Sequence, residues 1–495
     1  MVLQAAFSLA SSILPSKYYI HAAVSAVVLV VVYAFSQGRA TNRERDLHAR
    51  VILVTGAFSP LGLALITSLA SRGAQIIAIS SYPLDHAYPS VLIPLLRSTT
   101  NNENIFAEHA ELSNPASIRE FCTRFLTGQD QRLDAIVFAH EYHGIGSLFN
   151  VRRKSQGVPS PAEQRETSSL ATFLMVTLLL PALLVEPVER DIRIVNVVNP
   201  FYAASATVFG RQFTSIDASR PSSLFVQEGT RALRTAVLTR HLQRVLDSLP
   251  NRAPAGAPPS NVTSTETKNK DKKMLQKDVH HPSNIIAVSV SPGISRKDTI
   301  APLFGAERNA DEGWSLPGFL LYIVLLPLLV VITKSPDNAI QSVLHALFLP
   351  TPMKRVFAQV NAAVNSAPLR DKQEATENRT FYEEVLKPGA LYRECAVVQV
   401  ALPPLPKRPS PPAGEKADKG KAKGKAKEMA GVTETASHTG FTDDGEFGGE
   451  TMGRAVWEWY EDRLKKWEAQ AKERAGQREQ SGKEGQLAGE SSKTK

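Results

Sequence analysis

Cysteine is scarce in this chain, and lysine is absent from its middle. The 495 residues include only two cysteines, Cys122 and Cys395, which excludes a disulfide framework and fits a reducing compartment. No lysine occurs between Lys154 and Lys268, so any chemistry located in that stretch must do without an ammonium group. Internal repeats are also absent, and the net charge of +9 comes largely from the linkers and the tail.

Charge is missing from a region near the N-terminus as well. No charged residue lies between Lys17 and Arg39. At about 1.5 Å a residue, a helix over this run is about 32 Å long, enough to cross the hydrocarbon core of a bilayer. We predict an N-terminal tail over residues 1–17 and a transmembrane anchor over residues 18–38. The run is too long for the apolar part of a cleaved signal peptide.

The charges that flank the predicted anchor indicate its orientation. One basic residue, Lys17, precedes it, whereas four arginines follow at positions 39, 43, 45 and 50. Because basic residues gather on the cytoplasmic side of a span, we expect a single pass with the main domain in the cytosol. The membranes of the endoplasmic reticulum and the outer membrane of mitochondria fit this prediction equally well.

Beyond the anchor, short apolar runs alternate with helical patterns. Strands are predicted at Val51–Val54, Ala74–Ile79, Ile136–Ala139, Arg193–Val198 and Ile285–Val290. Helices are predicted at Leu63–Leu69, Thr167–Val185, Arg231–Leu249 and Ala339–Leu347. Strands that alternate with helices are typical of an α/β fold with a doubly wound, Rossmann-like parallel sheet.

The first strand leads into a glycine turn, Thr55–Gly62. Gly56 permits the tight turn, and Gly62 allows the next helix to pack closely. The N-terminus of that helix offers backbone N–H groups to a pyrophosphate. Taken alone, however, such a turn also occurs as a packing feature that binds nothing.

The order of these pieces resembles the short-chain dehydrogenase/reductase (SDR) superfamily. The matching pieces are Thr55-Gly56 with Gly62, Ala110-Glu111-Leu112, Leu133–Val137, Arg193–Val197, Pro292-Gly293 and Ser335–Ala339. The resemblance covers roughly residues 50–355, and within the superfamily the chain is similar to a fungal group of membrane-attached SDR-like proteins of unknown function. It implies an SDR-like Rossmann domain over residues 50–400. It also implies an NAD(P) site that includes Thr55, Gly56, Gly62, Ser80, Glu111, Pro292 and Gly293.

The catalytic slots that the resemblance implies hold other residues. SDR enzymes use a tyrosine as general acid/base, with a lysine four residues later that lowers the tyrosine pKa. Here these slots fall near Val226 and Thr230, inside the stretch without lysine. The serine slot holds Val198-Asn199, and the asparagine slot is Ser168. The remaining catalytic candidates are Tyr202 and Arg231.

The cofactor slots are altered too. Pro60 replaces the middle glycine of the phosphate loop, which removes a donor and adds a ring. Phe138-Ala139-His140-Glu141 stands where the family has Asn-Asn-Ala-Gly, and Ser80-Ser81 follows the second strand in place of an acid or arginine. NAD(P) is the only cofactor indicated, and these changes argue against it.

Two further candidates lie near the same edge of the predicted sheet. His140 and His143 flank Glu141-Tyr142, but two histidines without a third ligand are a weak metal signal, and we predict no metal site. Tyr202 paired with Asp217 or with His140 is a candidate for a rewired acid/base.

Several segments lie outside the expected core. We predict a disordered insertion at 251–283, an apolar lid or membrane-dipping segment at 314–333, a low-complexity linker at 404–453 and a disordered tail at 476–495. Between the last two lies a predicted amphipathic helix, 454–475, with Trp457, Tyr460, Leu464 and Trp467 on one face. This stripe either docks on a membrane or partner or packs back on the domain. The lysines of the linker lack aromatic interleaving, so nucleic acid is not an expected partner.

We therefore predict a membrane-anchored SDR-like protein with degenerate cofactor and catalytic motifs that acts as a binding or scaffold module. Its expected partners are the membrane, through residues 18–38, and a lipid or protein at the lid and the 454–475 helix. The alternative is an NAD(P)-dependent oxidoreductase that acts on a hydrophobic lipid or sterol carbonyl with rewired acid/base residues.

Overall fold

The computed structural model describes most of the chain. The described residues are 19–128, 132–149, 161–187, 190–210, 223–249, 283–306, 315–352, 384–403 and 445–491. The predicted N-terminal tail, nearly all of the 251–283 insertion, and residues 404–444 of the predicted linker lie outside them.

A single sheet forms the centre of the molecule. Its strands are β1 (Val51–Thr55), β2 (Gln75–Ser80), β3 (Ile105–His109), β4 (Ala135–Phe138), β5 (Ile192–Val197), β6 (Ile285–Ser291), β7 (Leu391–Arg393) and β8 (Ala396–Val398). Their order is β3-β2-β1-β4-β5-β6-β7-β8, with β7 and β8 antiparallel and all other pairs parallel. The prediction of a parallel-dominated, Rossmann-like α/β sheet is confirmed, and β8 adds an antiparallel edge.

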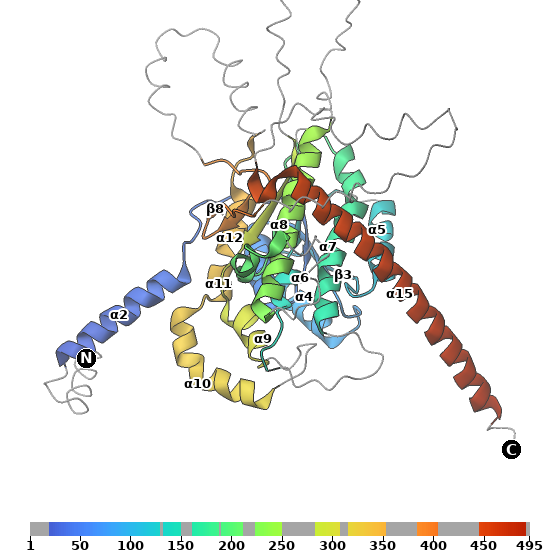
Figure 1. Cartoon of the computed structure of the whole chain (residues 1–495), viewed down its shortest axis with the longest axis horizontal. Coiled ribbons are helices and arrows are strands. Elements are labelled where there is room, and N and C mark those ends of the chain that lie inside the picture. Colours follow the sequence, from blue (N-terminus) through green and yellow to red (C-terminus); the bar gives the residue numbers. More distant parts are fainter. Residues whose placement is uncertain are drawn as a thin grey trace, which may run out of the picture.

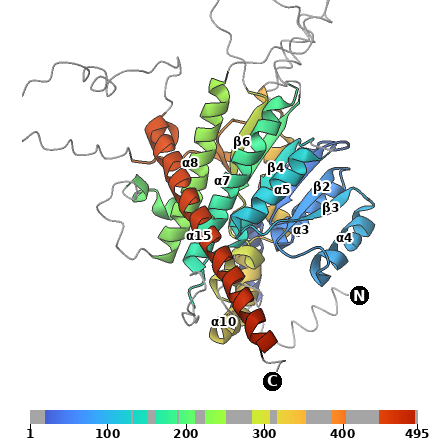
Figure 2. The same cartoon turned by 90° about the vertical axis from the view of Figure 1, so that its right-hand side faces the viewer.

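Helices cover both faces of the sheet (Figures 1 and 2). Successive residues of β1 alternate between two apolar clusters: Leu53 belongs to one and Ile52 to the other. One face carries α5 (Pro115–Thr127), α7 (Pro161–Val185) and α8 (Leu224–Ser248). The other carries α3 (Pro60–Ala70), α4 (Ala87–Thr100), α11 (Pro336–Ala339) and α12 (Gln341–Phe348).

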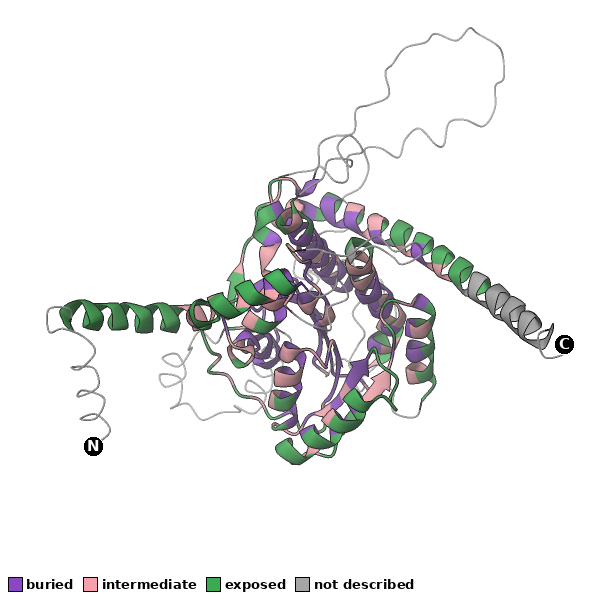
Figure 3. Cartoon of the chain, turned by 90° about the horizontal axis from the view of Figure 1, so that it is seen from below, coloured by how far each residue is buried: buried purple, intermediate pink, exposed green. Residues whose placement is uncertain are grey.

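Two helices among the described residues are long and apolar enough to cross a membrane by composition. One is Ala162–Val185 in α7, which is buried over 56% of its most apolar 18 residues and belongs to the core. The other is α2 (Tyr19–Gln37), which is 0% buried. A third apolar helix, α10 (Leu316–Ile332), is shorter and also exposes apolar side chains. Figure 3 shows α2 as an exposed rod that projects from the domain.

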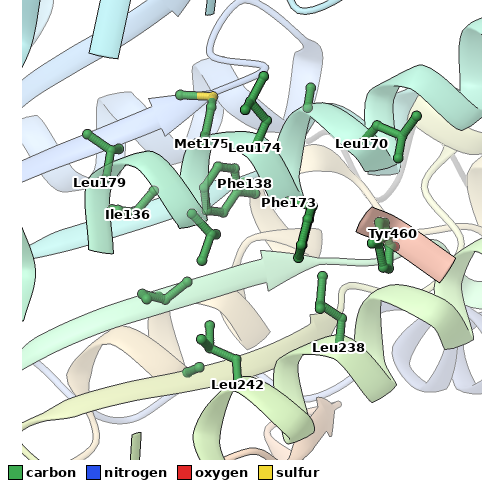
Figure 4. Packing of buried hydrophobic residues seen from close by; sticks show 14 of the residues in the cluster. Ile136, Phe138, Leu170, Phe173, Leu174, Met175, Leu179, Leu238, Leu242 and Tyr460 are labelled. Carbon is green, nitrogen blue, oxygen red and sulfur yellow. The ribbon is translucent and has the colours of Figure 1, made fainter. Parts of the chain in front are cut away.

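The C-terminal helix α15 (Gly449–Ser491) packs on its own domain, against α5, α7 and α8. Its buried side chains are Met452, Val456, Tyr460 and Trp467, and Trp457 and Leu464 are partly buried against the same cluster. Tyr460 stacks on Phe173 of α7 with ring centroids 5.2 Å apart (Figure 4). The predicted apolar stripe is thus covered by the domain itself, which matches the alternative that the helix packs back on the domain.

The boundaries of this helix differ from the sequence-based expectation. It starts at Gly449, inside the predicted linker, and continues through residues 476–491, where a disordered tail was expected. The segment has no proline, and its Glu, Gln, Lys and Arg residues favour a helix, whereas its four glycines oppose one. The helix is nucleated where its N-terminal half packs on the domain.

Candidate active site at the carboxyl edge of the sheet

The glycine turn is as tight as the sequence suggests. Gly56 has φ of +65°, and a Cβ there would lie 2.7 Å from the backbone nitrogen of His140. A Cβ on Gly62 would lie 2.1 Å from the carbonyl oxygen of Gly56. Both positions therefore require glycine, and α3 begins directly against the turn.

The N-terminus of α3 is fully used by the chain itself. Ser59 caps the helix, and its Oγ accepts from the Gly62 N–H at 3.0 Å. Pro60 has no N–H, and the next donor, the Leu61 N–H, points to Oδ1 of Asp298 at 3.0 Å. An internal carboxyl group thus lies where a helix N-terminus would hold a ligand anion.

Asp298 is held firmly in this position. It belongs to η5 (Arg296–Ile300), is fully buried, and accepts through Oδ2 from Ser295 Oγ at 2.9 Å. Nδ1 of His143 lies 3.6 Å from Oδ1 on the other side. A dinucleotide pyrophosphate in the usual pose would have to displace this carboxyl group from Leu61 and accept its negative charge as a neighbour. The residues present do not fit NAD(P) in that pose.

Other predicted cofactor residues likewise form hydrogen bonds to groups of the chain itself. Ser80 is buried and donates to the Tyr82 carbonyl at 2.8 Å, and exposed Glu111 accepts from Ser113 Oγ at 2.6 Å. The carbonyl of Pro292 accepts from Lys334 Nζ at 3.0 Å.

The segment after β4 forms the short helix α6 (His140–His143), which is tied to the glycine turn. Nδ1 of His140 lies 2.8 Å from Thr55 Oγ1, and its Nε2 lies 2.9 Å from the Ser168 carbonyl. Burial lowers the pKa of His140. Burial also raises the pKa of Tyr142 well above its usual range, and its hydroxyl donates to the Gly293 carbonyl at 2.8 Å.

A buried ion-pair network lies beside the catalytic slots on α8. Glu228 is 2% exposed and pairs with Arg165 Nε at 2.7 Å through Oε1 and with Arg231 Nη2 at 2.7 Å through Oε2. The same Arg231 Nη2 donates to the Gly144 carbonyl at 2.6 Å. Asn199, in the serine slot, donates to the Glu228 carbonyl at 3.0 Å, and Thr230, in the lysine slot, donates to the Val226 carbonyl at 2.8 Å.

The chain is similar to several known proteins. No protein-family model matches the chain. It is similar to an uncharacterized oxidoreductase, pbr1, of Schizosaccharomyces pombe, with 25% identity over 67% of this chain and 78% of the relative. An uncharacterized oxidoreductase of Saccharomyces cerevisiae is 28% identical over 64% of this chain and 72% of its own length. Dehydrogenase/reductase SDR family member 13 of Homo sapiens is 32% identical over 28% of this chain and 33% of its own length.

The names of these relatives support the resemblance of the chain to the SDR superfamily. Among solved structures it is similar to a short-chain dehydrogenase from Shigella flexneri, with 14% identity, a TM-score of 0.36, and coverage of 61% of this chain and 88% of that one. Another short-chain dehydrogenase, from Shigella flexneri 2a and complexed with NADP, has 16% identity, a TM-score of 0.34, and coverage of 59% and 97%.

The two catalytic candidates, Tyr202 and Arg231, are both buried. Tyr202, on η2 (Pro200–Ser205), is 4% exposed and packs in the apolar cluster. Its proposed partner His140 directs both ring nitrogens elsewhere, and Asp217 lies outside the described residues. Arg231 is 3% exposed and bound within the network on α8. Among the described residues, the pairing of Tyr202 with His140 is therefore not formed, and the pairing with Asp217 stays a prediction.

The C-terminal helix adds a group that sequence reasoning did not assign to this site. The hydroxyl of Tyr460 lies 2.5 Å from Ser169 Oγ and 3.5 Å from Thr235 Oγ1. Thr235 in turn donates to buried Glu141 at 2.8 Å, and Thr172 donates to the same carboxyl group at 2.6 Å. Burial raises the pKa of Tyr460 to about 12.

Among the described residues, no group of three or more His, Cys, Asp and Glu side chains is arranged to hold a metal ion. His143 approaches Asp298, and His140 bonds Thr55 and the Ser168 carbonyl. The two histidines therefore serve different parts of the site.

Proposed function

We propose that this protein is a membrane-anchored SDR-like module that binds or organises partners and does not carry out tyrosine–lysine redox catalysis. The observation that carries the proposal is the buried carboxyl group of Asp298 on the Leu61 N–H. It takes the backbone donor on which a pyrophosphate depends and adds negative charge at that point.

The network on α8 supports the same conclusion. Removing one partner of a buried, hydrogen-bonded ion pair is strongly destabilising, because the other charge remains buried without compensation. Glu228 and Arg231 are both almost fully buried, and each has several partners. A buried ion-pair network in which every member is engaged suits a structural role. A catalytic base, by contrast, needs access to the substrate and a proton that can move.

The membrane part of the proposal rests on α2. None of its side chains is buried in the domain, which it contacts through Ser36 and Gln37 at its C-terminal end, and its apolar length matches a bilayer core. Of the arginines that follow, Arg45 pairs with Asp191 at 3.0 Å and Arg50 pairs with Asp134 at 2.7 Å. The arginine-rich side of α2 is therefore joined directly to the folded domain. The proposed location is the cytosolic face of the endoplasmic reticulum or the mitochondrial outer membrane.

A second candidate is an NAD(P)-dependent oxidoreductase that acts on a hydrophobic carbonyl. The observation that favours it is that two relatives bear the name oxidoreductase. It requires a cofactor pose that avoids Asp298 and an acid/base other than the missing tyrosine–lysine pair. Tyr202 is the candidate for this replacement acid/base.

A turnover assay with the full chain in mild detergent separates the two candidates. The protein is mixed with NADH or NADPH and a set of sterol and long-chain ketones, and nicotinamide absorbance is followed. The proposal predicts no protein-dependent oxidation of either cofactor. Reduction of a ketone that is abolished by Tyr202→Phe, in a variant that keeps the circular dichroism of the parent, would overturn it.

A further inference from the structure

The helix α10 is apolar along its whole length and is only partly covered. It contains no charged residue between Ser315 and Thr333. Its exposed side chains include Leu320, Ile323, Val324 and Leu328, and Val324 is 74% exposed. Contiguous apolar surface of this kind is rare on proteins that face only water, and it marks an interaction surface.

The first turn of α10 is fixed to the domain. Ser315 caps the helix, and its N–H donates to the Gly305 carbonyl at 3.0 Å. Gly318 packs so closely that a Cβ there would lie 1.8 Å from the Phe304 carbonyl oxygen. The exposed face of α10 is therefore a fixed feature of the surface.

The last turn of α10 is joined to the end of α2. Ser36 Oγ donates to the Val331 carbonyl at 2.5 Å, and Gln37 Nε2 donates to the Thr333 carbonyl at 3.2 Å. Gln37 Oε1 accepts from Asn338 Nδ2 at 2.7 Å. These polar contacts hold the cytosolic end of the proposed anchor and the end of α10 at one point of the domain.

The two helices leave this point differently. α2 projects away from the domain, whereas α10 curves back beneath it (Figure 1). At about 1.5 Å a residue, α10 is about 26 Å long, somewhat short for a bilayer core. Both of its ends return to the same domain, so the helix has no need to cross.

We propose that α10 lies in the bilayer that α2 enters, in contact with lipid along its exposed face, so that the domain rests on the membrane through this helix. The inference rests on the membrane anchoring by α2 proposed above. Continuity with α2 favours lipid over a protein partner, because the last turn of α10 is fixed where the proposed span leaves the bilayer, next to the membrane surface. The absence of charge along the helix suits contact with hydrocarbon.

The test uses the full chain in vesicles with single reporter cysteines. The two native cysteines are buried, and the unsubstituted protein measures their background labelling. An environment-sensitive fluorophore is placed at Val324→Cys on α10, at Val28→Cys on α2, and at exposed Glu120→Cys on α5 as the water-facing control. Quenching is compared between phosphatidylcholine brominated on its acyl chains and aqueous iodide.

Lipid contact by α10 predicts that the labels at Val324 and Val28 are both quenched by brominated lipid, while the label at Glu120 responds only to iodide. If Val28 reports lipid but Val324 reports iodide, or neither quencher, α10 faces water or protein, and the inference fails while the anchor stands. If neither Val28 nor Val324 responds to brominated lipid, the anchor fails as well. The two failures are thereby distinguished.

Discussion

At the scale of single residues, Asp298 distinguishes between the two candidate functions, a binding module and an NAD(P)-dependent enzyme. Asp298→Ala frees the Leu61 N–H and removes a negative charge. We expect inorganic pyrophosphate to bind this variant at least about tenfold more tightly than the parent, a gain of ~1.4 kcal/mol. Calorimetric titration at low salt measures the difference.

Asp298→Asn provides the matched control, because it keeps an acceptor for Leu61 and removes only the charge. Its gain in affinity should be smaller than that of the alanine variant. Equal pyrophosphate affinity of all three proteins would show that the carboxyl group does not guard the helix N-terminus.

His140 gives the stability a pH dependence. Burial lowers its pKa from the ordinary 6.5, so above pH 6.5 both the folded and the unfolded chain hold a neutral imidazole. As the pH falls below 6.5, the unfolded chain takes up the proton first, and the free energy of unfolding falls by up to ~1.4 kcal/mol per pH unit from this group. The loss ends once the pH passes the folded pKa.

Denaturant unfolding between about pH 7.5 and 5.5 measures this slope. Since burial also lowers the pKa values of His241 and His345, the comparison with His140→Gln isolates the contribution. The variant should lose less stability over the same range. Parallel curves for the two proteins would mean that the imidazole of His140 titrates normally in the folded state.

At the scale of elements, α15 completes the apolar face formed by α7 and α8. Tyr460 is fully buried against Phe173. Tyr460→Ala should destabilise the fold by ~3–5 kcal/mol, as large-to-small aromatic changes do, whereas Tyr460→Phe loses only the hydroxyl contacts, about 1 kcal/mol. The unfolding temperatures of the parent and the two variants measure this order of stability.

Exposed Glu458 on the same helix serves as the control. Glu458→Ala should leave the unfolding temperature nearly unchanged. If Tyr460→Ala behaves like Glu458→Ala, then α15 does not contribute to the core, and its stripe would again be open to an outside partner.

The predictability of the elements follows from how they are buried. β1, β4, β5 and β6 are covered on both faces and are mostly apolar, although β5 also carries Arg193 and Asn196. β7 has three residues and owes its burial to its place beside β6, which no local pattern reveals. The continuation of α15 through 476–491 was not predicted for a related reason. The helix is nucleated by packing between Met452 and Trp467, nearer its N-terminus, and residues 476–491 extend it.

The site was predictable only in its local parts. The two glycines of the turn and the missing tyrosine–lysine pair can be read directly from the sequence. The Leu61–Asp298 hydrogen bond joins residues 237 positions apart, and the Ser169–Tyr460 bond joins residues 291 positions apart. Such contacts depend on the finished fold, so the sequence indicated that the cofactor slots were altered but not which group fills them.

At the scale of the whole molecule, one domain is joined at a single point to an exposed apolar helix and carries a closed site at the carboxyl edge of its sheet. If the site cannot accept a dinucleotide, its glycine turn serves packing, and function must be sought at the surfaces. If it can, the relatives' name of oxidoreductase applies here too, and the membrane contact would serve delivery of an apolar substrate.

Calorimetric titration of NADH and NADPH into the full chain in mild detergent tests this point most directly. The carboxyl group on the Leu61 N–H predicts no saturable binding of either cofactor up to millimolar concentration. Micromolar binding of either one would contradict the proposed module, because the cofactor would then have displaced Asp298 or found another pose, and the search for a substrate carbonyl should begin.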